Sequence, residues 1–401
     1  MAGGTPIERG RAGAPEAGPR ADTYADPDPA EPLAGSEVAV ADQGGHPAPR
    51  TGQTEEMPRV RLTRGRLTAS IVFVVSTAAF LYFVLPKLLG LRDTWNRLQH
   101  GNAWWLGLSA VLEACSFLGY VVLFRVVFVR RDSRIDWRAS YEITMAGLAA
   151  TRLFASAGAG GVALTAWALR RSGMDPRSVA CRMIAFMALL YGVFMACLVI
   201  GGLGLYLGLF PGQNPFAITV VPAIFGAVVI AIFLAVSLLP GDVDRFVGRW
   251  AHGGPLGRLA GHIAAVPAAA ASGIRTAIDL VRSRDASLLG AVAWWGFDIA
   301  VLWACFHAFG DTPPIAVIVM SYFVGMLGNV LPLPGGIGGV DGAMIGAFSA
   351  FGTAPSLAVV SVLAYRAFAF WLPTLPGAIA YLQLRRTVQR WRDDRPAPSY
   401  T

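Results

Sequence analysis

Arg366 and Asp341 are the residues of this sequence whose types and surroundings point most directly to binding chemistry. Each is a charged side chain within long apolar sequence, where insertion into a membrane costs roughly 2.5–3.5 kcal/mol per charge. Arg366 lies too deep in the apolar stretch that begins at Ser356 for its guanidinium to reach a membrane surface. We therefore expect Arg366 to line a polar cavity, where it either binds a ligand or pairs with an acid.

Four further isolated charges have similar alternatives. Asp341 either caps the helix that follows it or binds a cationic group of a ligand. Arg152 either holds a phosphate or pairs with Glu142 or Glu113. Glu113 and Asp298 both lie in the middle of apolar stretches. We expect either acid to neutralise an Arg across a bundle of helices.

Two glycine-rich runs interrupt the apolar sequence next to these charges. The first covers 155–161 (Ala-Ser-Ala-Gly-Ala-Gly-Gly), and the second covers 332–341 (Pro-Leu-Pro-Gly-Gly-Ile-Gly-Gly-Val-Asp). Pro and Gly are the poorest helix formers, so no helix continues through the second run. The amides at such a break, and the N-termini of half-helices, attract anions such as phosphate. The predicted substrate-binding residues are Arg152, Gly160, Gly161, Pro334, Gly335, Gly336, Gly338, Gly339, Asp341 and Arg366.

Other kinds of chemistry lack the residues that they need. The sequence contains no nucleophile elbow, Walker loop, HExxH motif or dinucleotide fingerprint. Its four cysteines match no metal-ligand spacing and no disulfide framework. We therefore expect no catalytic residues, no metal, no cofactor and no enzymatic activity. A basic domain that could bind nucleic acid is also missing.

The elements that position these residues are membrane helices. Of the 401 residues, 55% are hydrophobic and only 14% are charged, whereas a soluble domain has about 25% charged residues. Several apolar stretches reach the roughly 20 residues that cross a bilayer as a helix. The predicted spans cover 67–85, 104–129, 178–209, 216–239, 286–309 and a last stretch that begins at 356.

Arginine clusters indicate on which side these spans end. Clusters at 59–66, 130–138, 170–177 and 385–392 mark cytoplasmic segments, so both termini are predicted to be cytoplasmic. The first glycine-rich run thus has two cytoplasmic flanks. The second run has no Lys or Arg nearby, which indicates two external flanks. Re-entrant helical hairpins would meet both conditions; the alternatives are packed spans with a tight turn for the first and a tight external loop for the second.

The two broken stretches also resemble each other in sequence. Residues 156–162 align without gaps to 334–340, and a helix, a Pro-containing turn and a long span follow each. Opposite charge signals around similar segments are typical of the inverted repeats of transporters. The predicted fold is therefore an all-α polytopic membrane protein. It has about six transmembrane helices and two re-entrant hairpins arranged as an inverted repeat.

The chain ends differ from this membrane domain in composition. Residues 1–58 contain four Arg against ten Asp or Glu and few large apolar side chains, which predicts a disordered acidic tail. The transmembrane domain is expected over 59–390. A short cytoplasmic tail follows over 391–401.

The second glycine-rich run and the downstream Leu-Ala-Tyr-Arg of 363–366 resemble the transmembrane region of lysylphosphatidylglycerol synthases, which also occurs alone in flippase-like proteins. The stretch 150–173 is similar to the first glycine-rich segment of that family. Two departures stand out. Asp341 replaces a Glu that many members have. The first motif carries Ala163 and Thr165 instead of Pro and charged residues.

This resemblance implies a function in lipid transport. The bifunctional synthases add a large soluble catalytic domain, and only a short basic tail follows Arg386 here. We therefore expect a plasma-membrane flippase or transporter of aminoacyl-phospholipids or other lipid-linked substrates. The alternative is a non-catalytic scaffold or accessory subunit of a cell-envelope lipid-modifying enzyme. The expected partners are the lipid substrate, a second copy of this chain in a homodimer, or such an enzyme.

Overall fold

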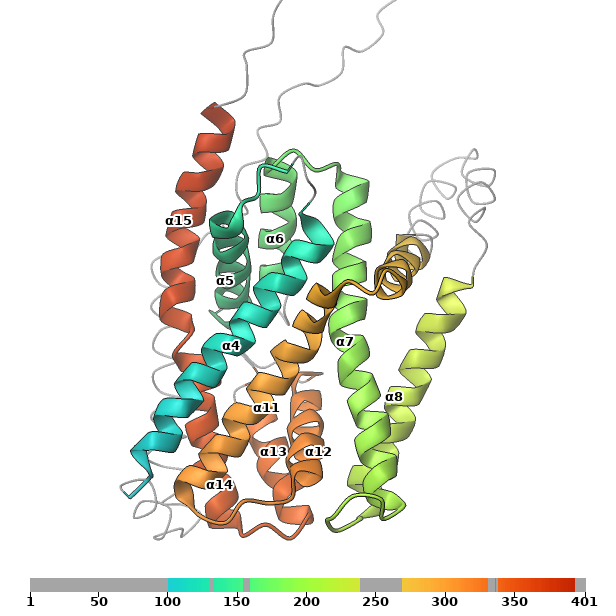
Figure 1. Ribbon diagram of the computed structural model, residues 1–401, viewed down its shortest axis with the longest axis vertical. Coiled ribbons are helices and arrows are strands. Elements are labelled where there is room, and N and C mark those ends of the chain that lie inside the picture. Colours follow the sequence, from blue (N-terminus) through green and yellow to red (C-terminus); the bar gives the residue numbers. More distant parts are fainter. Residues whose placement is uncertain are drawn as a thin grey trace, which may run out of the picture. The chain divides into compact units, whose positions relative to one another are not determined.

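A computed structural model describes residues 100–129, 133–153, 159–238, 269–330, 336 and 338–393 (Figure 1). All regular secondary structure within these ranges is helical. The predicted first span, 67–85, and the predicted tail over 1–58 lie outside the described residues. The prediction of an all-α protein is confirmed for the part that is described.

Five helical segments are long and apolar enough to cross a membrane. They are α4 (Ala103–Phe128), α7 (Pro176–Tyr206), α8 (Phe216–Ser237), α11 (Leu289–Phe309) with the 3-10 turn η2 (Ala286–Leu288), and the stretch Pro355–Asp393. These five correspond to the second to sixth spans predicted from the sequence. The chain is therefore a multi-pass membrane protein.

The last of these segments contains an irregular turn next to the predicted binding residue Arg366. It consists of α14 (Pro355–Arg366), the π-helical turn η5 (Ala367–Trp371) and α15 (Thr374–Asp393). The Leu372 amide donates to the Ala367 carbonyl, five residues back, at 3.0 Å. Pro373 follows and has no amide hydrogen to donate. Such π turns are frequent at functional sites.

Four short helices form two pairs. α5 (Trp137–Leu153) packs on α6 (Ala159–Arg171), and α12 (Ile315–Met326), extended by the 3-10 turn η3 (Leu327–Val330), packs on α13 (Gly339–Ala350). α6 has 13 residues, or about 20 Å, against about 30 Å of hydrocarbon in a bilayer. The pairs lie toward opposite ends of the bundle (Figure 1). A further helix covers 269–282.

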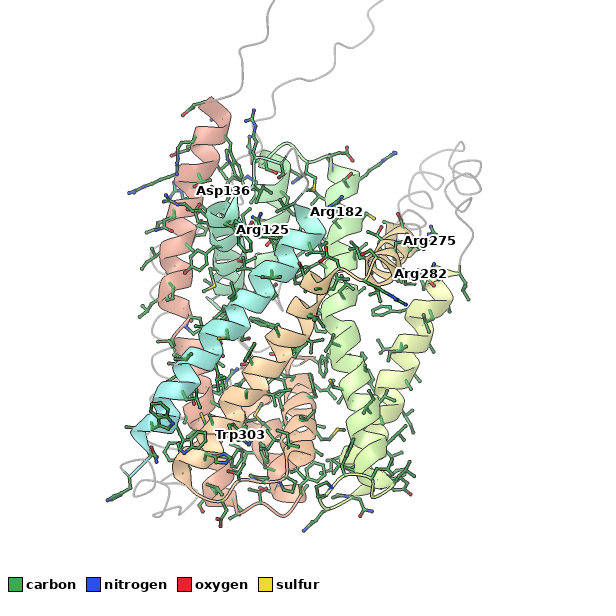
Figure 2. All side chains as sticks on the ribbon, viewed as in Figure 1. Arg125, Asp136, Arg182, Arg275, Arg282 and Trp303 are labelled. Carbon is green, nitrogen blue, oxygen red and sulfur yellow. The ribbon has the colours of Figure 1, made fainter. Side chains whose placement is uncertain are left out.

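Labelled side chains mark the two ends of this bundle. In Figure 2, Arg125, Asp136 and Arg182 lie in the half of the bundle that holds α5 and α6. Trp303 lies near the opposite end, where α12 and α13 are found. The guanidinium of Arg125 donates to the Ser140 hydroxyl at 3.0 Å.

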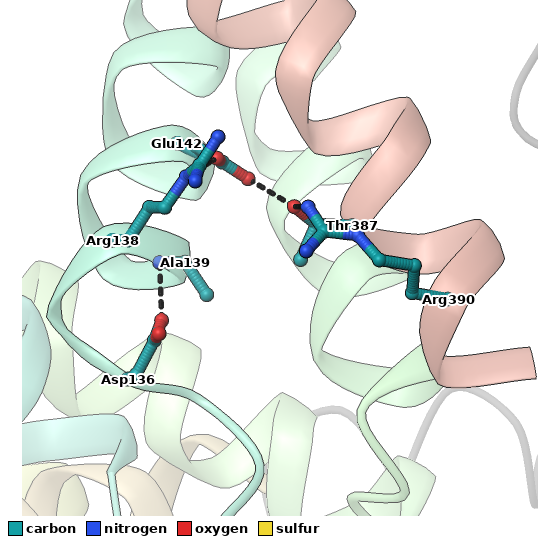
Figure 3. Close-up of polar contacts among 6 residues, drawn as sticks. All are labelled: Asp136, Arg138, Ala139, Glu142, Thr387 and Arg390. Carbon is teal, nitrogen blue, oxygen red and sulfur yellow. Dashed lines mark hydrogen bonds and ion pairs between the residues drawn. The ribbon is translucent and has the colours of Figure 1, made fainter. Parts of the chain in front are cut away.

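Side-chain caps begin several helices. The Asp175 carboxylate accepts from the amides of Arg177 and Ser178 at 3.0 and 3.1 Å, and Pro176 occupies the first turn of α7. At α5, the Asp136 carboxylate accepts from the Ala139 amide at 2.7 Å (Figure 3). These caps stop the preceding chain from continuing as helix.

A buried acid joins α5 to α15. The Glu142 carboxylate accepts from the Thr387 hydroxyl at 2.6 Å and pairs with Arg138 at 2.9 Å (Figure 3). The Glu142 side chain is fully buried. Glu142 is thus held by Arg138 and Thr387, so the predicted alternative in which Arg152 pairs with Glu142 is wrong.

Glycines bring α4 and α11 into backbone contact. A Cβ added at Gly290 would lie 2.5 Å from the Gly119 carbonyl oxygen and 2.9 Å from the Leu123 amide nitrogen. Membrane helices associate through such close packing of small residues, because the hydrophobic effect does little to drive association between helices that are surrounded by apolar lipid. This contact fixes the two helices that carry Glu113 and Asp298.

Gly290→Ala is expected to destabilise the protein by about 1–3 kcal/mol, since the added methyl group overpacks the α4–α11 contact. Gly296→Ala is the matched control on the same helix, because a Cβ there has no neighbour within 4 Å. Thermal denaturation in detergent, followed by size-exclusion chromatography, measures both. Equal melting temperatures for the two variants would contradict the role of this contact.

Candidate functional site

A cavity of about 620 Å³ lies inside the bundle. Its walls come from the long helices α4, α7 and α11, from α14 with η5, and from the short helices α5, α6 and α12 with η3. The polar and charged side chains that line it include Glu113, Thr151, Arg152, Thr165, Asp298, Tyr322, Asn329, Tyr365 and Arg366. Charged residues from distant parts of the sequence therefore meet in one place.

Arg366 lines this cavity and pairs with Asp341. The Arg366 Nε atom lies 2.7 Å from Asp341 Oδ1, and the Arg366 guanidinium carbon lies 4.8 Å from the centre of the Phe370 ring. Both charged residues are buried, at 9% and 2% exposure. Arg366 thus lines a polar cavity, as predicted, and of the two roles predicted for it there the structure shows the pairing with an acid.

Asp341 occupies the first turn of α13 and caps it. Its Oδ2 atom accepts from the Gly338 amide at 2.8 Å, which is the predicted helix-capping role. Because the other oxygen pairs with Arg366, the carboxylate is already engaged on both sides. The geometry thus favours the cap over the predicted contact with a cationic ligand.

Arg152 lines the cavity from the end of α5 and has a different environment. Its guanidinium carbon lies 5.6 Å from the centre of the Phe117 ring and 5.8 Å from that of Phe370. Glu113 and Asp298 are close enough to act on its charge. Within the described residues, no carboxylate lies at ion-pair distance from Arg152. This guanidinium therefore retains donors for a ligand.

Glu113 and Asp298 form a buried acid centre between α4 and α11. Asp298 accepts a hydrogen bond from the Tyr365 hydroxyl at 3.0 Å and another from the Tyr322 hydroxyl. The Glu113 carboxyl group lies within hydrogen-bonding reach of Asp298. The two acids are only 2% and 6% exposed. Glu113 and Asp298 together constitute this acid centre.

The sequence did not reveal the two tyrosines of this network. Tyr322 and Tyr365 are each almost fully buried, and both are ordinary members of apolar helices when read along the chain. One signal was available for Tyr365, because it immediately precedes Arg366 in the Tyr-Arg motif that supports the family resemblance. Glu113 and Asp298 were predicted to neutralise an Arg, and Arg152 does lie near them.

The predicted glycine contacts divide into three groups. Gly161 and Gly336 line the cavity, whereas Gly160, Gly338 and Gly339 are not among its lining residues. Pro334 and Gly335 lie outside the described residues. Gly336 and Gly338 have φ angles of +65° and +84°, which only glycine adopts readily. These two positions end the second break in a conformation that other residues resist.

The first break also contributes polar groups. Thr151 and Thr165 line the cavity from α5 and α6. Gly147 and Gly161 allow the two helices to touch there, since a Cβ at Gly161 would meet both the Gly147 carbonyl oxygen and the Thr151 hydroxyl. The departure from the family pattern at Thr165 therefore still leaves a hydroxyl group facing the cavity.

A second hollow, of about 400 Å³, lies between α4, α5 and the start of α15. Its lining is almost entirely apolar, with Phe117, Leu118, Trp137, Tyr141 and Leu372 among its residues. Several of these side chains are exposed on the outer surface of the bundle, including Leu118 at 59% and Trp137 at 58%. Glu113 lines both hollows, so the apolar groove adjoins the polar cavity at the acid centre.

Comparisons with known proteins agree with the resemblance predicted from the sequence. Residues 67–377 match the model of the lysylphosphatidylglycerol synthase transmembrane region. A UPF0104 membrane protein of Methanothermobacter thermautotrophicus is 24% identical over 326 residues, which cover 78% of this chain and 94% of that protein. A UPF0104 membrane protein of Methanocaldococcus jannaschii is 35% identical over 95 residues, which cover 23% of this chain and 28% of that protein.

Proposed function

Since this chain belongs to the family of the lysylphosphatidylglycerol synthase transmembrane region, we propose that it carries phospholipids or lipid-linked substrates across the membrane. The observation that carries this proposal is the cavity between the two pairs of short helices, with Arg152 and Arg366 in its wall. A transporter needs a polar site near the bilayer midplane where broken helices meet. Here, the substrate would leave chemically unchanged.

The headgroup end of the substrate fits the cavity. Arg binds phosphate through paired hydrogen bonds that match the anion's geometry. Arg152 supplies these donors without losing an existing ion pair in the described structure. Thr151 and Thr165 offer hydroxyl groups on the same side for a sugar, glycerol or aminoacyl portion of the headgroup.

The acyl end fits the apolar groove. The groove is open on the outer surface of the bundle between α4, α5 and α15, and it meets the cavity at Glu113. A lipid with its phosphate near Arg152 would thus place its acyl chains against Phe117 and Leu118. Its polar headgroup would stay in the cavity and would not enter the hydrocarbon of the bilayer. A water-soluble substrate would have no use for this adjoining apolar surface.

The pairs α5–α6 and α12–α13 would supply the two gates. One helix of each pair, α6 with 13 residues and α13 with 12, is too short to cross a bilayer alone, and the pairs lie toward opposite ends of the bundle (Figure 1). This arrangement supports two re-entrant hairpins related as an inverted repeat, which would open the cavity to one side at a time. The arginines near α5, α6 and the end of α15 favour a cytoplasmic location for that end and for the C-terminus.

Lipid movement in vesicles tests this function. The purified protein is reconstituted into plasma-membrane-like vesicles that contain a trace of phosphatidylglycerol labelled with a fluorophore on an acyl chain. A membrane-impermeant quencher is expected to reach label from both leaflets when protein is present, and only outer-leaflet label in protein-free vesicles. Equal quenching in the two samples would overturn the proposal and leave the scaffold alternative.

A further inference from the structure

The acid centre has a feature that phosphate binding does not explain. Glu113 Oε2 and Asp298 Oδ1 are buried, and neither has a hydrogen-bond partner in the described structure. Two ionised carboxylates offer only acceptors, so each oxygen remains unsatisfied and the two groups repel each other. A proton held between them supplies the missing donor and removes the repulsion. The geometry therefore favours a proton on the acid centre.

The surroundings of the acid centre limit its charge. Arg152 faces it from α5, Tyr322 from α12 and Tyr365 from α14. The other titratable groups nearby are Tyr120, Tyr191, Cys305 and Arg366, and Arg366 is already neutralised by Asp341. Arg152 is thus the one cation among the described lining residues that is left to balance two acids.

Cavity charge then depends on how many protons the acid centre holds. With both acids ionised, the charges of Glu113, Asp298 and Arg152 leave the cavity net negative, which repels a lipid phosphate. One proton makes the cavity neutral, and two protons leave Arg152 free to neutralise one phosphate. Net charge is expensive in a low-dielectric interior. Phosphate binding and proton binding therefore favour each other, by the reciprocity of linked equilibria.

We propose that the acid centre binds a transported proton, so that a phosphate-bearing lipid and protons cross the membrane together. This inference rests on the proposed transport function and names its energy source. A proton from water on one side adds to a carboxylate oxygen of Glu113 or Asp298, and the same O–H bond breaks when the proton leaves to water on the other side. Tyr322 and Tyr365 position Asp298 through their hydrogen bonds.

A pH difference across reconstituted vesicles tests the coupling. Lipid is expected to accumulate in the leaflet on the alkaline side, at up to about tenfold per pH unit for each proton moved, since one pH unit is worth 1.36 kcal/mol. Labelled phosphatidylglycerol is the probe, and the distribution is read with the impermeant quencher. If wild-type protein distributes the labelled lipid equally between the leaflets despite the pH difference, or accumulates it according to a sodium gradient, the inference is wrong. Lipid exchange between the leaflets in the same vesicles would still support the proposed function.

Isosteric variants locate the proton. Glu113→Gln and Asp298→Asn are expected to bring the leaflet ratio close to one under the same pH difference, because neither amide can hold the transported proton. Asp279→Asn, at an exposed part of the helix 269–282, is the matched control and should accumulate lipid like wild type. Accumulation by either acid-centre variant at the wild-type ratio would contradict the assignment.

Infrared difference spectra provide a readout that needs no lipid movement. Acidification of the purified protein is expected to produce the C=O band of a protonated carboxyl group, and this band should be absent or shifted in Glu113→Gln. If the wild type shows no carboxyl band that depends on Glu113 or Asp298, the proton site is wrong even if lipid transport is observed. If the band appears but no lipid moves in any vesicle, the proposed function fails while the proton site stands.

Discussion

Arg152→Gln is expected to slow lipid movement by roughly 10- to 100-fold and to leave the folded protein intact. A hydrogen bond to a charged group contributes about 1.5–3 kcal/mol, and each 1.4 kcal/mol is a factor of ten. The fold should tolerate this change because the described structure gives Arg152 no direct ion-pair partner, and a further proton on the acid centre can compensate for the lost charge. Quenching kinetics of labelled phosphatidylglycerol in vesicles measure the rate.

Arg177→Gln is the matched control for that measurement. It removes the same charge from an exposed position at the start of α7, away from the cavity lining. Its rate should equal that of wild type. If Arg152→Gln moved lipid as fast as Arg177→Gln, with both proteins monodisperse in detergent, Arg152 would have no part in binding phosphate.

Asp341→Ala should have the largest effect on stability, a loss of roughly 3–5 kcal/mol. Removing one partner of a buried ion pair takes away the charge that compensates the other at close range, and Arg366 is only 9% exposed. The same change removes the cap that accepts from the Gly338 amide. The melting temperature in detergent measures the loss, with Asp311→Ala at an exposed loop position as the control.

The double variant of Asp341→Ala with Arg366→Ala separates the ion pair from the cap. Removing both charges should be less damaging than the sum of the two single changes, because no uncompensated charge remains. Strict additivity of the three unfolding measurements would show that Asp341 and Arg366 do not stabilise each other. In that case, the ion pair at 2.7 Å would contribute nothing to the free energy of unfolding.

The long helices were predictable from the sequence because a membrane span depends on local composition. Segments such as α8 need only about 20 apolar residues in a row, and their ends follow from Pro, Asp and Arg at the boundaries. The two pairs of short helices were predictable for the same reason, since Gly and Pro end a helix wherever they cluster. The interpretation of each pair as a re-entrant hairpin stays a prediction.

The site was only partly predictable because it depends on which helices face each other. Asp298, Tyr322 and Tyr365 come from three separate helices and meet only through tertiary packing. Sequence spacing gives no information about such a meeting. Isolated charges in apolar sequence were a sufficient signal for Arg152 and Arg366, but the partner of each required the structure: Arg366 pairs with Asp341, and Arg152 does not pair with Glu142.

The glycine contact between α4 and α11 has a mechanical consequence. Two helices whose backbones touch at Gly119 and Gly290 cannot slide or rotate against each other without a clash. The two helices therefore form one rigid unit, and this unit carries Glu113 and Asp298. Arg152 and Arg366 belong to other elements, α5 and α14. A shift of α5 or α14 relative to α4 and α11 would therefore change the distance between these arginines and the acid centre, and that distance is a quantity that spectroscopic labels can measure.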